Sequence, residues 1–168
     1  MKNKITKYIL LAFTCLGLQA CLFQEDDIFE KSSANRATEN VAELQELLVN
    51  VPNGWKMEYY PGTDYSMGGI TLLCRFDGNN VTLMSEVGSV KTASGKEASS
   101  LYKVTSEEST VLTFDSFNEF IHCFSEPIMG MNTNLEGDYE FVYMGQEDNK
   151  VILQGRRYHN TMVMTPLT

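Results

Sequence analysis

Histidine, cysteine and proline are scarce in this chain, and their scarcity excludes several kinds of functional site. The 168 residues include two histidines, four cysteines and four prolines. His122 and His159 lie in neither an HExxH nor a CxxC-like pattern, so we expect no metal site. The sequence also lacks a G-x-S-x-G motif, a phosphate-binding glycine-rich loop and a convincing pair of glycosidase carboxylates. It therefore predicts no cofactor and offers no catalytic signature.

No apolar run is long enough to cross a membrane, but residues 1–20 have the pattern of a signal peptide. Three lysines precede residues 8–18, which are apolar and uncharged and fall well short of the roughly 20 residues of a membrane span. Leu18-Gln19-Ala20-Cys21 then resembles a lipobox, with a small residue before the cysteine. We expect cleavage after Ala20 and lipidation of Cys21, which would hold the mature chain on a membrane. The alternative is ordinary secretory cleavage with Cys21 as a bystander.

Basic residues are outnumbered, and this argues against a nucleic-acid partner. Lysine and arginine total 13 against 22 acidic residues, which gives a net charge of −9. Loss of residues 1–20, which carry three lysines and no acidic residue, would bring the net charge close to −12. Such a domain repels nucleic acid, and no basic patch with interleaved aromatic residues is present.

The mature chain divides into a short tether, residues 21–31, and one β-rich domain, residues 32–168. Residues 22–27 end in an acidic run, which is either a solvated tether or a sorting signal. Acidic runs behind a lipidated cysteine resemble the surface-export signals of lipoproteins from gut anaerobes. We therefore expect a lipid-anchored outer-membrane protein on the periplasmic or the cell-surface face, with the surface favoured.

One long helix should open the domain. Ser32 or Ser33 can cap it, and Pro52-Asn53-Gly54 should stop it. Apolar residues recur at spacings of three and four between Ala37 and Val51, which is a narrow stripe typical of packing on a sheet.

From Trp55 the hydrophobic period changes to two, which predicts short strands joined by tight turns. We expect an α+β, mostly β fold: an N-terminal helix followed by an antiparallel meander that forms a curved sheet or an open barrel. A short helix, capped by Ser116 and ended near Pro127, should plug one mouth of the sheet. The predicted strands cover residues 55–60, 70–76, 81–85, 101–105, 111–115, 139–144, 151–156 and 161–165, with a polar loop over 88–99.

The last predicted strand, residues 161–165, has no later strand to pair with. It should therefore form an unprotected apolar sheet edge, and residues 22–168 alone should self-associate. Two explanations compete: the edge docks a partner, or the chain is part of a longer domain.

Few side chains qualify as ligand contacts. Trp55, Tyr59, Tyr60 and Tyr65 could stack on a sugar, although a tryptophan at the start of a strand is more often in the core. His122 and Cys123 are adjacent, but neighbouring residues of a helix point in different directions, which favours packing over catalysis for His122. His122 is also a candidate ligand contact. Cys74 and Cys123 should be buried free thiols rather than a disulfide. Glu136-Gly137-Asp138 has too few ligands for a calcium loop and is better explained as a turn.

A set of short motifs along the chain resembles an uncharacterised lipoprotein family, domain of unknown function 4302. Members of that family are longer, so the chain resembles their N-terminal portion. Cys123 stands where an aromatic residue is commoner. The motifs that carry the resemblance are Phe29, Ser33 and Arg36; residues 54–61; Gly68-Gly69 and Phe76; residues 100–102, 112–115 and 117–118; His122, Phe124 and Pro127; and residues 137–141 and 153–155.

The family has no established activity, and the resemblance implies an accessory role at an outer-membrane nutrient-import system. We therefore expect a binding or scaffolding protein rather than an enzyme, with import-complex proteins or a glycan as partners. The alternatives are a lipid-anchored hydrolase whose catalytic groups lie outside this chain, and a purely structural envelope protein.

Overall fold

The computed structural model describes residues 33–89, 92–127 and 133–168. The chain divides into two units, Met1–Ser33 and Ala34–Thr168, and the second unit contains the folded domain. The predicted signal peptide, the cleavage site at Ala20, the lipidated Cys21 and the tether all lie outside the described residues. In the described part of the chain, no helix has both the length and the apolar character that a membrane crossing needs.

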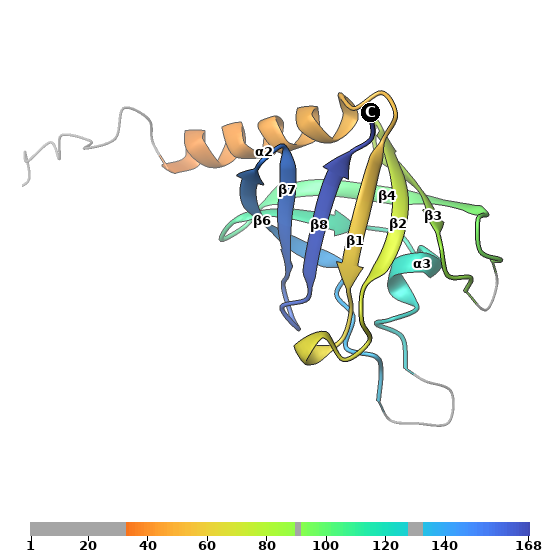
Figure 1. Ribbon diagram of the computed structural model, residues 1–168. Coiled ribbons are helices and arrows are strands. Elements are labelled where there is room, and N and C mark those ends of the chain that lie inside the picture. Colours follow the sequence, from red (N-terminus) through yellow and green to blue (C-terminus); the bar gives the residue numbers. More distant parts are fainter. Residues whose placement is uncertain (1–32, 90–91, 128–132) are drawn as a thin grey trace, which may run out of the picture. The chain divides into compact units, whose positions relative to one another are not determined.

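Eight antiparallel strands of the described chain form a closed barrel in which each strand pairs with its sequence neighbours (Figure 1). The predicted fold class, an α+β and mostly β meander with one N-terminal and one short helix, is confirmed. The strands are β1 (Trp55–Tyr60), β2 (Ile70–Asp77), β3 (Asn80–Ser85), β4 (Glu97–Ser106), β5 (Thr110–Phe114), β6 (Glu140–Glu147), β7 (Lys150–Gly155) and β8 (Thr161–Pro166).

The predicted free edge at residues 161–165 is wrong, because β8 closes the barrel. β8 pairs with β7 on one side and with β1 on the other, where Met164 lies opposite Met57 and Thr161 opposite Tyr60. Met162 and Met164 are buried in the core, while Val163 between them is half-buried. An alternating strand of this kind needs a neighbour on each side, and in a barrel the first strand supplies the second neighbour. The predicted self-association through this edge therefore loses its physical basis.

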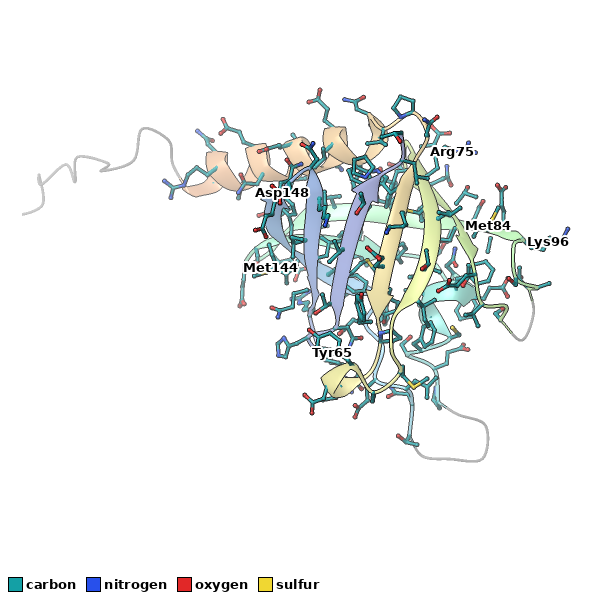
Figure 2. The ribbon with its side chains drawn as sticks, viewed as in Figure 1. Tyr65, Arg75, Met84, Lys96, Met144 and Asp148 are labelled. Atoms are coloured by element: carbon teal, nitrogen blue, oxygen red, sulfur yellow. The ribbon has the colours of Figure 1, made fainter. Side chains whose placement is uncertain are left out.

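The barrel interior is filled by every second side chain of the strands. In β1, Trp55, Met57 and Tyr59 are buried and the residues between them are half-buried. Pairing of β6 with β7 slips between Tyr143 and Gly145, and this bulge leaves Met144 on the outer surface (Figure 2). The alternation predicted from sequence thus separates core from surface in most strands. It is broken at the bulge and in β5, where all five residues are buried.

The helix α2 (Ser33–Val49) lies across one end of the barrel (Figure 1). Leu44 and Leu48 are fully buried and join the core of the barrel. The indole Nε1 of Trp55 donates a hydrogen bond to the carbonyl oxygen of Leu48 at 3.0 Å, which fixes the end of the helix to the start of β1. The predicted helix, its apolar stripe and its packing on the sheet are confirmed.

Most elements differ from their predicted boundaries by one to four residues, and the short helix and β4 show a physical cause. The helix α3 (Glu119–His122) is capped by Asn118, whose Oδ1 accepts from the backbone N–H of Phe120 at 3.1 Å. Ser116, the predicted cap, instead accepts a hydrogen bond from the backbone N–H of Leu101. β4 begins inside the predicted polar loop, because Ser99 pairs with β3 through polar rather than apolar side chains.

Candidate functional site

Trp55 and Tyr59, two of the predicted ligand contacts, lie in the core. Trp55 is 1% exposed and its N–H group is satisfied by α2. Tyr59 is fully buried, and its hydroxyl lies 2.9 Å from the carbonyl oxygen of Asp138 and 3.2 Å from Oδ1 of Asn160. Burial raises the pKa of Tyr59 far above its usual value, so the hydroxyl stays protonated and acts as a donor. Neither ring presents a face to solvent.

The hydroxyl of Tyr59 belongs to a buried polar cluster at the end of the barrel away from Trp55. The carboxylate of Asp138 accepts hydrogen bonds from the backbone N–H groups of Arg157, Tyr158 and Asn160 at 2.9 to 3.2 Å. This arrangement satisfies a carboxylate that is only 3% exposed. A Cβ atom on Gly155 would lie 1.9 Å from Oδ2 of Asp138, so only glycine fits beneath the carboxylate.

Asn160 extends this cluster to a third loop. Its Oδ1 accepts from the backbone N–H of Asp138 at 2.8 Å, and its Nδ2 donates to the carbonyl oxygen of Gly62 at 3.3 Å. The loops after β1, before β6 and between β7 and β8 are therefore fixed to one another. The segment Glu136-Gly137-Asp138, where a turn is predicted, therefore holds the neighbouring loops in place through the hydrogen bonds of Asp138.

Two recesses lie beside this cluster, and Tyr158 lines both of them. The larger has a volume of about 440 Å³, and the smaller has a volume of about 250 Å³. A further hollow of about 170 Å³ beside Arg75 and Glu97 has no aromatic residue in its lining. The larger recess is lined by Ser125, Asn134, Tyr139, Glu140, Arg157 and Tyr158 among others, and the smaller by Tyr60, Asp64, Tyr65, Tyr158, His159 and Thr161 among others.

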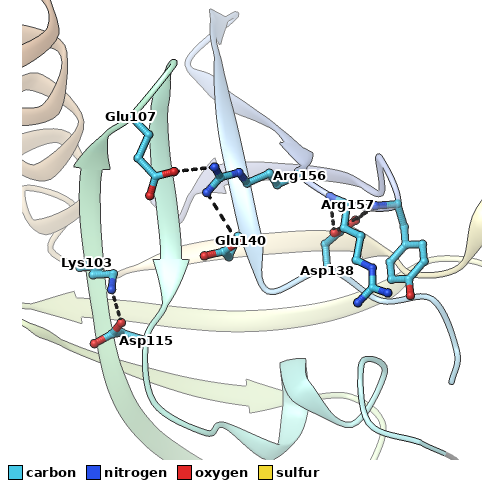
Figure 3. Close-up of polar contacts among 8 residues, drawn as sticks. Lys103, Glu107, Asp115, Asp138, Glu140, Arg156 and Arg157 are labelled. Carbon is cyan, nitrogen blue, oxygen red and sulfur yellow. Dashed lines mark hydrogen bonds and ion pairs between the residues drawn. The ribbon is translucent and has the colours of Figure 1, made fainter.

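The two arginines of the larger recess have different environments (Figure 3). Arg156 pairs with Glu107 at 2.5 Å and lies 3.8 Å from Glu140. The guanidinium of Arg157 instead lies over the ring of Tyr158, 4.9 Å from its centroid. Among residues 33–89, 92–127 and 133–168 no carboxylate forms an ion pair with Arg157. The recess thus offers a guanidinium donor, the carboxylate acceptor of Glu140 and an aromatic face.

Tyr60, Tyr65 and His122, the remaining predicted contacts, lie in or beside these recesses. Tyr60 lines the smaller recess and meets the ring of Tyr65 edge to face at 5.6 Å. The ring of His122 stacks on Tyr139 at 4.8 Å and lies 5.4 Å from Phe117. Tyr139 is 41% exposed and also lines the larger recess.

The environment of His122 and Cys123 does not resemble a nucleophile and its base. Burial lowers the pKa of His122, and its Nδ1 accepts from the backbone N–H of Asn118 at 3.0 Å. Burial, followed by the charge of Glu126, raises the pKa of Cys123 to about 11, so this thiol is protonated at neutral pH. Cys74 and Cys123 are both free thiols, as predicted, but only Cys74 is buried, whereas Cys123 is half-buried.

Backbone strain is concentrated at the same end of the barrel. Asp64, Tyr65 and His159 have left-handed φ values of 55°, 58° and 59°, and each lines the smaller recess. Glu136, with φ of 53°, accepts a hydrogen bond through its side chain from Thr63, the first residue of the 3-10 helix η2 (Thr63–Tyr65). Such conformations cost about 1–3 kcal/mol each and cluster at ligand sites. Asp148 and Asn149, which also have positive φ, simply form the β6–β7 turn.

Comparison with known proteins identifies one family. The family described as domain of unknown function (DUF4302) matches residues 25–168. No curated protein and no solved structure matches the chain. Within the described residues, no group of three or more histidine, cysteine, aspartate or glutamate side chains is placed to hold a metal ion.

Proposed function

The chain belongs to the family of domain of unknown function DUF4302, and from this premise we propose that it is a lipid-anchored binding protein that holds a carbohydrate for an outer-membrane nutrient-import system. The single observation that supports carbohydrate binding is the pair of recesses that Tyr158 lines in common. The anchor rests on the lipobox-like sequence that ends at Cys21.

The lining of the recesses suits a polyhydroxylated ring. A sugar presents an apolar face of C–H groups, which packs on aromatic rings such as Tyr158 and Tyr65. Its hydroxyl groups need both donors and acceptors, and Arg157 and Glu140 supply one of each. The larger recess, at about 440 Å³, lies in the range of small-ligand sites.

A carbohydrate fits this surface better than a peptide does. Peptides commonly add a strand to an exposed sheet edge, but β1 and β8 pair with each other and close the barrel. A peptide helix needs an apolar groove, whereas both recesses contain charged or amide side chains between their aromatic rings.

Polysaccharide retardation in native gels tests carbohydrate binding by the full-length protein. Gels containing neutral gluco-, manno- or xylo-polysaccharides, or polygalacturonate, should slow the protein in at least one case. Tyr158→Ala should weaken that interaction at least tenfold, or about 1.4 kcal/mol, because the wall shared by both recesses is lost. Tyr158→Phe should keep most of it, since the ring remains.

The matched control is Met144→Ala, which removes an exposed side chain (57%) from the bulge of β6 and should bind as the parent does. Equal retardation of the parent and Tyr158→Ala would contradict the site.

For the anchor, Cys21→Ala should leave the membrane fraction after a carbonate wash. Its retention in the pellet would contradict lipidation at Cys21.

A further inference from the structure

We infer that the ligand is a chain of several sugar rings, bound across three aromatic stations around one end of the barrel. The first station is Tyr60 with Tyr65, the second is Tyr158 with Arg157, and the third is Tyr139 with His122 and Phe117. This inference rests on the proposed carbohydrate binding and extends it to the length of the ligand.

The three stations follow one another without a break. Tyr158 lines both recesses, so the first and second stations share a wall. Tyr139 lines the larger recess together with Tyr158, which joins the second station to the third. A ligand with a single sugar ring would occupy one recess and would not contact the other stations.

Each station is held in place by contacts within the protein. The hydroxyl of Tyr65 lies 3.3 Å from Oγ1 of Thr161, and its ring meets Tyr60 edge to face. The hydroxyl of Tyr158 accepts from the side chain of Asn134 at 3.5 Å. The ring of Tyr139 is nearly parallel to that of His122, with an angle of 24° between them. Rings that are already fixed lose little conformational entropy when a ligand binds.

The outer stations are open to solvent. Tyr65 is 61% exposed, Tyr139 is 41% exposed and Phe117 is 47% exposed. A chain that crosses the central recess can therefore extend past it at both ends. This arrangement favours the interior of a polysaccharide over a free monosaccharide.

Titration calorimetry with oligosaccharides of defined length tests this inference on the full-length protein in detergent. The probes are gluco-, manno- and xylo-oligosaccharides of one, two, four and six rings, with oligogalacturonates of the same lengths. In the series that binds, affinity should rise at least tenfold between two and six rings. Tyr139→Ala should remove most of this rise and weaken the binding of six rings far more than the binding of two, because Tyr139 supplies the third station but only part of the lining of the larger recess.

Two further variants separate a lost contact from a disturbed fold. Tyr139→Phe keeps the ring and should retain the gain with length, and Phe117→Ala should reduce it. Equal affinity for one and six rings, or an equal loss at every length in Tyr139→Ala, would overturn the extended site. In that case the proposed function would still stand if Tyr158→Ala abolished binding. If no series binds, the proposed function fails together with this inference.

Discussion

The charge of His122 depends on the fold. Its ring is half-buried between Tyr139 and Phe117, and its Nδ1 accepts from the backbone of Asn118. Burial is the largest influence and lowers its pKa, while the carbonyl of Asn118 and the charge of Glu126 oppose that shift. The folded protein therefore favours the neutral ring more than the unfolded chain does.

This preference predicts a pH-dependent stability. In the unfolded chain His122 takes up its proton near pH 6.5, and in the folded protein it does so only at lower pH. The unfolded state thus binds more protons between these two values, and the free energy of unfolding should fall as pH decreases below about 6.5. Urea denaturation at pH 7.5 and 5.5 measures the fall, which should be smaller in His122→Gln. Identical falls in both proteins would contradict this role of His122.

Sequence reasoning identified aromatic residues near the site better than it identified their roles. Trp55 and Tyr59 alternate with polar residues, as core residues of a strand do, and both are buried. Tyr60 points to the opposite face of β1. Arg157 and Tyr158 were missed, because the turn between β7 and β8 carries no periodic pattern. The available signal was a turn with two adjacent arginines and a tyrosine in an acidic chain, framed by Gly155 and Asn160.

The close packing of Asp138 against Gly155 could also not be predicted from the sequence. Gly137-Asp138 and Gly155 are separated in sequence, yet the carboxylate of Asp138 sits where a side chain on Gly155 would be. A local pattern predicts a turn at each position. It does not predict that one turn caps the other, since that depends on the pairing of β6 with β7.

At the level of elements, α2 shows how periodicity alone can predict packing. Its apolar stripe predicted one face against the sheet, and Leu44 and Leu48 occupy that face. The cap of α3 was mispredicted because Ser116 and Asn118 are both good capping residues. Tertiary contacts decide between them: Ser116 binds the backbone of Leu101, and Asn118 also donates to the carbonyl oxygen of Ala98.

The last turn of α2 allows a test with adjacent residues. Leu48→Ala should reduce the free energy of unfolding by about 2–5 kcal/mol, because it leaves a cavity where a fully buried side chain packs on the barrel. Val49→Ala should change it by less than about 0.5 kcal/mol, since Val49 is 40% exposed. Urea denaturation followed by the fluorescence of Trp55, the single tryptophan, measures both. Equal effects of the two substitutions would show that the free energy of unfolding does not depend on the packing of this face of α2.

At the scale of the whole molecule, the order of the strands along the chain does not determine whether the sheet closes into a barrel. The eight strand segments were predicted from alternation and turns, and a meander of such strands can remain a curved sheet or close into a barrel. The difference depends on pairing between β1 and β8, whose residues are about a hundred positions apart in sequence. Six paired positions from Trp55 to Tyr60 provide the closure.

Closure predicts what happens when β8 is removed. Deletion of residues 161–168 would leave β1 and β7 each without a neighbour and would uncover core side chains such as Met57 and Leu153, which lie on those two strands. Unpaired edges beside an exposed apolar interior promote association between chains. The shortened chain should therefore elute as large oligomers in size-exclusion chromatography and lose its cooperative thermal transition. Deletion of Thr168 alone, which lies beyond β8 and is exposed, should change neither property. A monomeric, cooperatively melting chain without β8 would mean that the other seven strands are stable as an open sheet.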